Sequence, residues 1–395
     1  MKKVALWCVI LLFLLGRLLL PVTAAESASA GENDADIDAE AAMIEEAFSD
    51  LVAAIPPEVA ELLPSGFFSK DMTEVGAAVE EASAVGAVME TVGRLTGLAI
   101  GENLVLLASI CGILLLSACF RALKEGMQVS GDTARALSLC ATLALCLVIV
   151  SLQRTRFFEI SSFFKGMKSV SAAMLPIMGT LYAMGGNVSA AVANHGVMSV
   201  FLSLLENVIA VTVMPVAGIC LCLGLLDALT GKGHLRSLAA LIKRTYTWTF
   251  SLLMLLLCGV LGIQTTLAKG SDGLAMRTVR FAAGSFLPVV GGSVSEALRT
   301  VAGSVAYLRS VVGAAVVLLL LLSFLPIFIS VLLNRIVFLL GGAMAKLMGC
   351  EGEEKLLSEL SSVYGYFLAV IASLFVTVTF SVTLFAHCAT AGGGL

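Results

Sequence analysis

Residues 310–335, SVVGAAVVLLLLLSFLPIFISVLLNR, decide the fold class of this chain. No charged side chain occurs in them before the final arginine, and a bilayer-spanning helix needs about 20 consecutive, mainly apolar residues. Pro326 lies inside the run, where a membrane helix tolerates a kink if neighbouring groups satisfy the freed carbonyl. The stretch therefore predicts a long, kinked transmembrane helix.

The composition of the whole chain agrees with this interpretation. Of 395 residues, 59% are hydrophobic and 13% are charged, and the mean hydropathy is +1.01. A soluble enzyme of this length needs many more Asp, Glu, Lys and Arg residues to cover its surface. The sequence therefore predicts an all-α, polytopic membrane protein.

Further apolar runs predict about six to eight membrane spans. Four are clear, at residues 98–120, 134–152, 247–267 and 363–386, and residues 198–226 form a second kinked span around Pro215. Two more runs, at residues 172–193 and 281–305, are only moderately apolar and rich in Gly, Ser and Asn. We expect these two to be broken or re-entrant segments.

An internal repeat links the two broken segments. The sequence LPIMG at residues 175–179 matches LPVVG at residues 287–291, and the spacings from these motifs to the kinked spans agree within one residue. We expect a two-helix hairpin at residues 98–152, then repeat units at residues 153–267 and 268–388, and a short tail at 389–395. The residues that define the units are Pro176, Gly179, Pro215, Pro288, Gly291, Gly292 and Pro326. Their irregular backbone either lines a cavity or interface, or permits close helix packing.

The topology has two alternatives. If both Leu-Pro segments are re-entrant, there are six spans in parallel repeats, with cytoplasmic loops at residues 121–135, 227–246 and 336–362. Lys232, Arg236, Lys243 and Arg244 make the second loop the best indicator of orientation. If the segments cross, there are eight spans in inverted repeats, as in many transporters.

The N-terminal region is predicted to lie outside the cytoplasm. Residues 1–25 resemble a secretory signal peptide, with an uncleaved anchor as the alternative. Residues 26–97 hold 16 acidic and two basic side chains and form a small helical ectodomain. Ile44, Phe48 and Leu51 belong to one apolar stripe there, and we expect the stripe to contact the membrane surface, a neighbouring helix or a partner protein.

The sequence offers little for catalysis. It has three histidines, no H-E-x-x-H helix and no nucleotide-binding P-loop, and its cysteines form no metal-site pattern, so we predict no catalytic, cofactor or metal residues. The basic residues form no patch that would suggest nucleic-acid binding. Glu206 is the one ionisable residue expected within a span, where it either marks a transport path or caps a helix near the interface.

These features together resemble one known family. The leader, the acidic ectodomain, the paired Leu-Pro motifs and the stretch FAAGSFLPVVGG at residues 281–292 resemble the stage III sporulation protein AE family of endospore-forming bacteria. The resemblance implies a component of a mother-cell complex in the outer forespore membrane, with the acidic segment in the intermembrane space. It also implies partners in the same complex, including a separate ATPase and a forespore membrane protein.

Two functions therefore remain open at this level. The resemblance implies a non-enzymatic component of a channel or secretion-like complex that late forespore development requires. The alternative is a solute transporter or export permease with a pathway at the repeat interface. Composition alone supports only membrane assembly or transport.

Overall fold

A computed structural model describes residues 61, 63–69, 72–126, 131–184, 196, 200, 208–230, 234–286 and 291–390. Within these residues the chain is helical and contains no strand, which confirms the all-α prediction. The elements are η1 (Ser65–Phe68), α4 (Met72–Ser83), α5 (Val85–Gly126), α6 (Gly131–Met184), α8 (Ala210–Thr230), α9 (His234–Phe286), α10 (Gly291–Leu347) and α11 (Glu351–Thr390).

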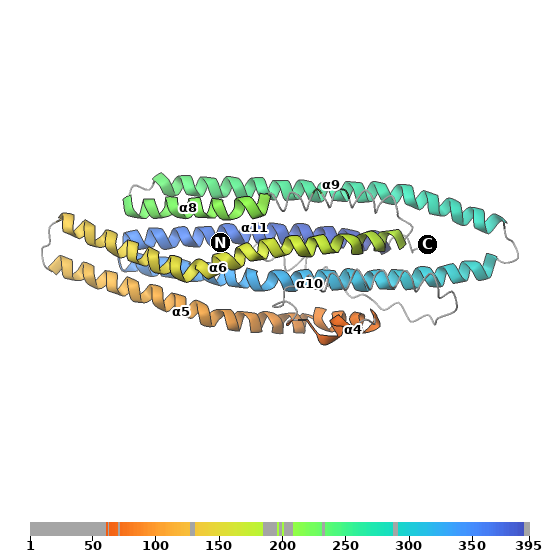
Figure 1. Ribbon diagram of the computed structural model, residues 1–395, viewed down its shortest axis with the longest axis horizontal. Coiled ribbons are helices and arrows are strands. Elements are labelled where there is room, and N and C mark those ends of the chain that lie inside the picture. Colours follow the sequence, from red (N-terminus) through yellow and green to blue (C-terminus); the bar gives the residue numbers. More distant parts are fainter. Residues whose placement is uncertain are drawn as a thin grey trace.

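The helices form one elongated bundle (Figure 1). Helices α5, α8 and α10 end at the same end of the bundle, where α6, α9 and α11 begin; we call this the proximal end. Helix α8 and helix α10 therefore run in the same direction, as parallel repeats require. Residues 281–305, which we expected to form a broken or re-entrant segment, include the end of α9 and the start of α10.

Five of the described helices are long and apolar enough to cross a bilayer. The candidate spans are Gly86–Phe120 in α5, Cys140–Met167 in α6, Val211–Thr230 in α8, Val311–Leu347 in α10 and Glu351–Ser381 in α11. This confirms a polytopic membrane protein. The predicted span at residues 247–267 lies within α9.

The loops predicted at the proximal end were too long. Helix α10 continues to Leu347 and α11 begins at Glu351, so most of residues 336–362 is helical, and helices α8 and α9 likewise occupy most of residues 227–246. Gly349, with φ 69°, ends α10, and Cys350 donates its backbone N–H to the carbonyl of Ala345 at 2.8 Å. This left-handed glycine cap ends α10 with a very short connection to α11. The polar side chains near the connection therefore lie on helices and not in a loop.

The first Leu-Pro segment differs from the prediction. We expected a break at residues 175–179, but α6 continues through Pro176 and Gly179 to Met184. The prediction was wrong there because an internal proline removes one backbone donor without obliging a long helix to end. At the second segment, α9 ends at Phe286 and α10 begins at Gly291, and residues 287–290 lie outside the described ranges.

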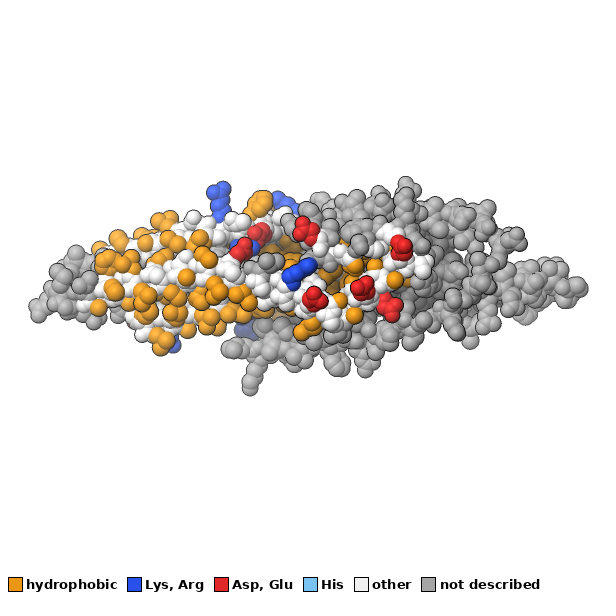
Figure 2. Space-filling view, turned by 90° about the horizontal axis from the view of Figure 1, so that it is seen from below, with side chains coloured by type: hydrophobic (Ala, Val, Ile, Leu, Met, Phe, Trp, Pro, Cys, Tyr) orange, Lys and Arg blue, Asp and Glu red, His pale blue; other side chains and the backbone are white. Residues whose placement is uncertain are grey.

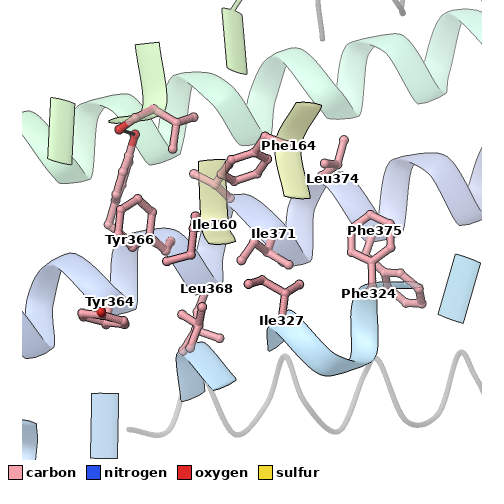
Figure 3. Close-up of a cluster of buried hydrophobic side chains, with 14 of the residues drawn as sticks. Ile160, Phe164, Phe324, Ile327, Tyr364, Tyr366, Leu368, Ile371, Leu374 and Phe375 are labelled. Carbon is pink, nitrogen blue, oxygen red and sulfur yellow. Dashed lines mark hydrogen bonds between the residues drawn. The ribbon is translucent and has the colours of Figure 1, made fainter. Parts of the chain in front are cut away.

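The apolar core surrounds α10 and α11. Residues 311–322 of α10 are almost all buried, and a helix that is apolar on every side is one that other helices enclose. Figure 3 shows side chains of α6, α10 and α11 meeting in this core. The ring of Phe324 lies 5.1 Å from that of Phe375 and 5.1 Å from that of Phe163, centroid to centroid. These edge-on aromatic contacts fix α10 against its two neighbours.

The N-terminal elements pack on the outside of α10. Phe67 of η1 and Val75 of α4 are fully buried, and the apolar face of α4 contacts α10. Glu74, Glu80 and Glu81 lie on the exposed side of α4. Figure 2 shows acidic side chains beyond the hydrophobic belt that covers the proximal part of the bundle.

Candidate functional site

The first half of α11 is a polar centre that touches most of the other helices. Glu353 accepts a hydrogen bond of 2.8 Å from the Ser117 hydroxyl of α5, and the Tyr364 hydroxyl donates to the side-chain oxygen of Gln153 on α6. All four side chains are buried. A buried polar group without a partner costs free energy in lipid as in a protein core, so these pairs specify how α11 sits against α5 and α6.

A buried ion pair connects α11 to α9. Lys243 Nζ contacts Glu359 Oε1, and the two side chains are only 6% and 2% exposed. Helix α8 covers the pair through Gly224: a Cβ at this position would lie 2.2 Å from Cγ of Glu359. Only glycine therefore allows α8 to approach the carboxylate so closely.

A second buried carboxylate lies one turn from this contact. Asp227 follows Gly224 by three residues on α8, so both face α9 and α11. Its Oδ1 accepts the backbone N–H of Leu235 at 3.2 Å, which caps the first turn of α9. Its Oδ2 is buried and has no hydrogen-bond partner among the described residues. Arg236 of α9 donates to the Ser358 hydroxyl of α11 at 2.5 Å.

The environment of these charges differs from that of the other ion pairs described. Removing two charges from water costs several kcal/mol per ion, and a buried pair is kept only where geometry and hydrogen bonds compensate. By contrast, Arg156 pairs with Glu102, whose side chain is 67% exposed, and with Glu159 at 2.8 Å. The exposed ion pairs of Arg156 contribute little to the free energy of folding. The buried Lys243–Glu359 pair, by contrast, fixes α9 against α11.

A hydroxyl cluster follows further along the same helices. Thr212 Oγ1 of α8 lies 2.6 Å from the Tyr246 hydroxyl of α9, and the Tyr366 hydroxyl of α11 donates to the carbonyl of Val213 at 3.4 Å. The rings of Tyr246 and Tyr366 are 5.4 Å apart at their centroids. Just after this cluster comes Pro215, which cannot donate a backbone hydrogen bond, although α8 continues through it.

Of the residues singled out from the sequence, the described helices contain those of the first Leu-Pro motif, in α6, and four others in α8 and α10. Pro215 lies on the exposed side of α8, Pro326 is partly buried inside α10, and Gly291 and Gly292 begin α10. The remaining predicted residues lie outside the described ranges: Pro288, Glu206, Ile44, Phe48 and Leu51. Pro215 and Pro326 thus belong to different parts of the bundle.

The sequence interpretation missed the buried charges. It placed Lys243 and Glu359 in loops and counted Lys243 as a marker of orientation, whereas an amine buried against a carboxylate is not a free loop charge. The expectation that Glu206 was alone among ionisable groups in spans was wrong, because Asp227 and Glu359 lie within candidate spans. The apolar periodicity of Leu356, Leu360 and Val363, which continues that of the last span, could have shown that this region is helical.

The described residues contain no group of three or more His, Cys, Asp or Glu side chains that could hold a metal ion. The chemistry of the site is therefore that of hydrogen-bonded charges and hydroxyls between helices. Such groups can orient helices or contact polar solutes.

The comparisons with known proteins identify the family. A sequence model of the family "Stage III sporulation protein AE" matches residues 69–389, which include every long helix described above. The chain belongs to this family. It is thus a multi-pass membrane protein of a sporulation family, as the resemblance implied.

A curated relative gives the same family name. The stage III sporulation protein AE of Bacillus subtilis (strain 168) is 25% identical over 219 residues. The match covers 55% of this chain and 55% of the relative, so the chain spans about half the length of the relative it matches. No solved structure matches the chain.

Proposed function

We propose that the chain is a non-enzymatic membrane component of a multiprotein channel or secretion-like complex that links mother cell and forespore during endospore formation. Its family supports the link to sporulation. Its place would be the mother-cell-derived outer forespore membrane, with the acidic N-terminal segment in the intermembrane space. Its partners would be other stage III subunits, including a separate ATPase and a forespore membrane protein.

The observation that carries the proposal is the length of the helices. Helices α6, α9 and α10 contain 54, 53 and 57 residues. At 1.5 Å per residue each is about 80 Å long, whereas the hydrocarbon core of a bilayer is about 30 Å thick. The bundle must therefore extend well beyond the membrane.

The excess length lies at the end opposite the proximal end. Residues 291–310, the part of α10 furthest from the proximal end, hold Glu296, Arg299 and Arg309 and are less apolar than the run that follows them. Helix α4 lies beside α10 away from the proximal end (Figure 1). Helices that extend beyond the membrane on the side of the acidic segment could bind partners between two membranes. A permease that works alone has no need of such an extension.

Affinity purification from sporulating cells tests the proposal. The tagged full-length chain, extracted in mild detergent, should recover a membrane protein made in the forespore and an ATPase made in the mother cell. A chain that purifies alone, and that by itself moves small solutes across proteoliposomes, would support the transporter alternative.

A further inference from the structure

The polar contacts between α9 and α11 continue beyond the buried ion pair and form a row. After Lys243–Glu359 and Tyr246–Tyr366 come Ser251 and Ser373, whose hydroxyl oxygens are 3.2 Å apart. Cys258 of α9 and Thr377 of α11 then lie in side-chain contact. We call these residues the polar seam.

The polar seam occupies one face of each helix. On α11, Glu359, Tyr366 and Ser373 recur every seven residues, which places them on one side of the helix. The buried residues Phe367, Ile371 and Leu374 belong to its apolar core faces. On α9, the neighbouring residues Leu252 and Leu255 are exposed and suited to lipid. A row of polar side chains therefore runs along this interface, beside the apolar faces of the same helices.

The length of the polar seam matches the thickness of a membrane. From Glu359 to Thr377 the helix advances about 18 residues, or about 27 Å, against about 30 Å for the hydrocarbon core. Ionisable groups at membrane depth face the bundle interior or a water-filled cavity, pair with one another and mark solute pathways. The row here continues through the candidate span of α11.

We propose that the polar seam between α8, α9 and α11 is a pathway for small hydrophilic solutes through the membrane part of the bundle. This inference rests on the channel role proposed above and places part of the path within this chain. At the proximal end of the seam, Lys243 and Glu359 present both signs of charge, and Oδ2 of Asp227 is buried without a described partner. Beyond them the lining is mainly hydroxyl, which favours small polar solutes over apolar ones.

Thiol labelling in membranes from sporulating cells tests the inference with the complete complex. The probe is a small, positively charged methanethiosulfonate reagent that does not cross lipid. One variant retains Cys258 as its sole cysteine, which leaves the native residue in place; others add Ser373→Cys or Ser251→Cys to a cysteine-free chain. Leu374→Cys in the apolar core and Leu252→Cys on the exposed face of α9 are matched controls, each one residue away from a seam position.

Seam thiols should react at least tenfold faster than both controls. Equal rates at Cys258, Ser373→Cys and Leu374→Cys would overturn the inference and leave the seam as interhelical packing. Partner recovery is measured on the same membranes. Slow labelling with every partner retained would refute the pathway alone, whereas fast labelling in a chain without partners would refute the complex and keep the pathway.

Discussion

Breaking the buried ion pair should destabilise the bundle strongly. Replacing Lys243 with methionine keeps a long side chain but leaves Glu359, only 2% exposed, buried without its ion-pair partner. Removing one partner of a buried pair costs about 3–5 kcal/mol, because the remaining charge loses its compensation. We therefore expect Lys243→Met to lower the free energy of unfolding by about 3–5 kcal/mol.

A double variant separates the charge from the packing. Lys243→Met with Glu359→Met replaces the pair by apolar side chains of similar volume, an exchange that is often neutral or stabilising by about 1–4 kcal/mol. The double variant should recover most of the loss. Glu102→Gln, at an exposed ion pair with Arg156, is the control and should change stability by less than about 1 kcal/mol.

Unfolding by sodium dodecyl sulfate in mixed micelles, followed by circular dichroism, measures these free energies. The reasoning would be refuted if Lys243→Met lowered the free energy of unfolding by less than about 1 kcal/mol, because that is the effect expected for an exposed ion pair. A double variant no more stable than the single one would also refute it, because the loss would then come from packing and not from an uncompensated charge.

Three further substitutions test other contacts with the same assay. Gly224→Ala should cost about 1–3 kcal/mol, because its Cβ would overlap Glu359 Cγ at 2.2 Å; an unchanged stability would mean that α8 lies further from α11. Tyr364→Phe should cost about 1–3 kcal/mol by leaving the Gln153 side chain buried without its donor, and no loss would place Gln153 in contact with water. Phe67→Ala should cost about 3–5 kcal/mol and increase proteolysis near α4, unless η1 separates from α10 in the membrane.

The sequence alone determined the class of protein. Long runs such as residues 310–335 can be satisfied only as helices in a bilayer, whichever neighbours they have, because the backbone must bond within its own segment. The family resemblance could also be recognised, since it depends on local motifs such as residues 281–292. These features need no knowledge of which helix packs on which.

The tertiary structure alone decided which polar residues are buried. Lys243 and Glu359 are 116 residues apart in the sequence and looked like loop charges, until the packing of α8, α9 and α11 brought them together. At Pro176 the error was of another kind: the proline predicted a break in the helix, but α6 continues through it. Burial and pairing arise from contacts between distant segments, so hydropathy and spacing do not encode them position by position, whereas the bilayer imposes helices on each apolar segment separately.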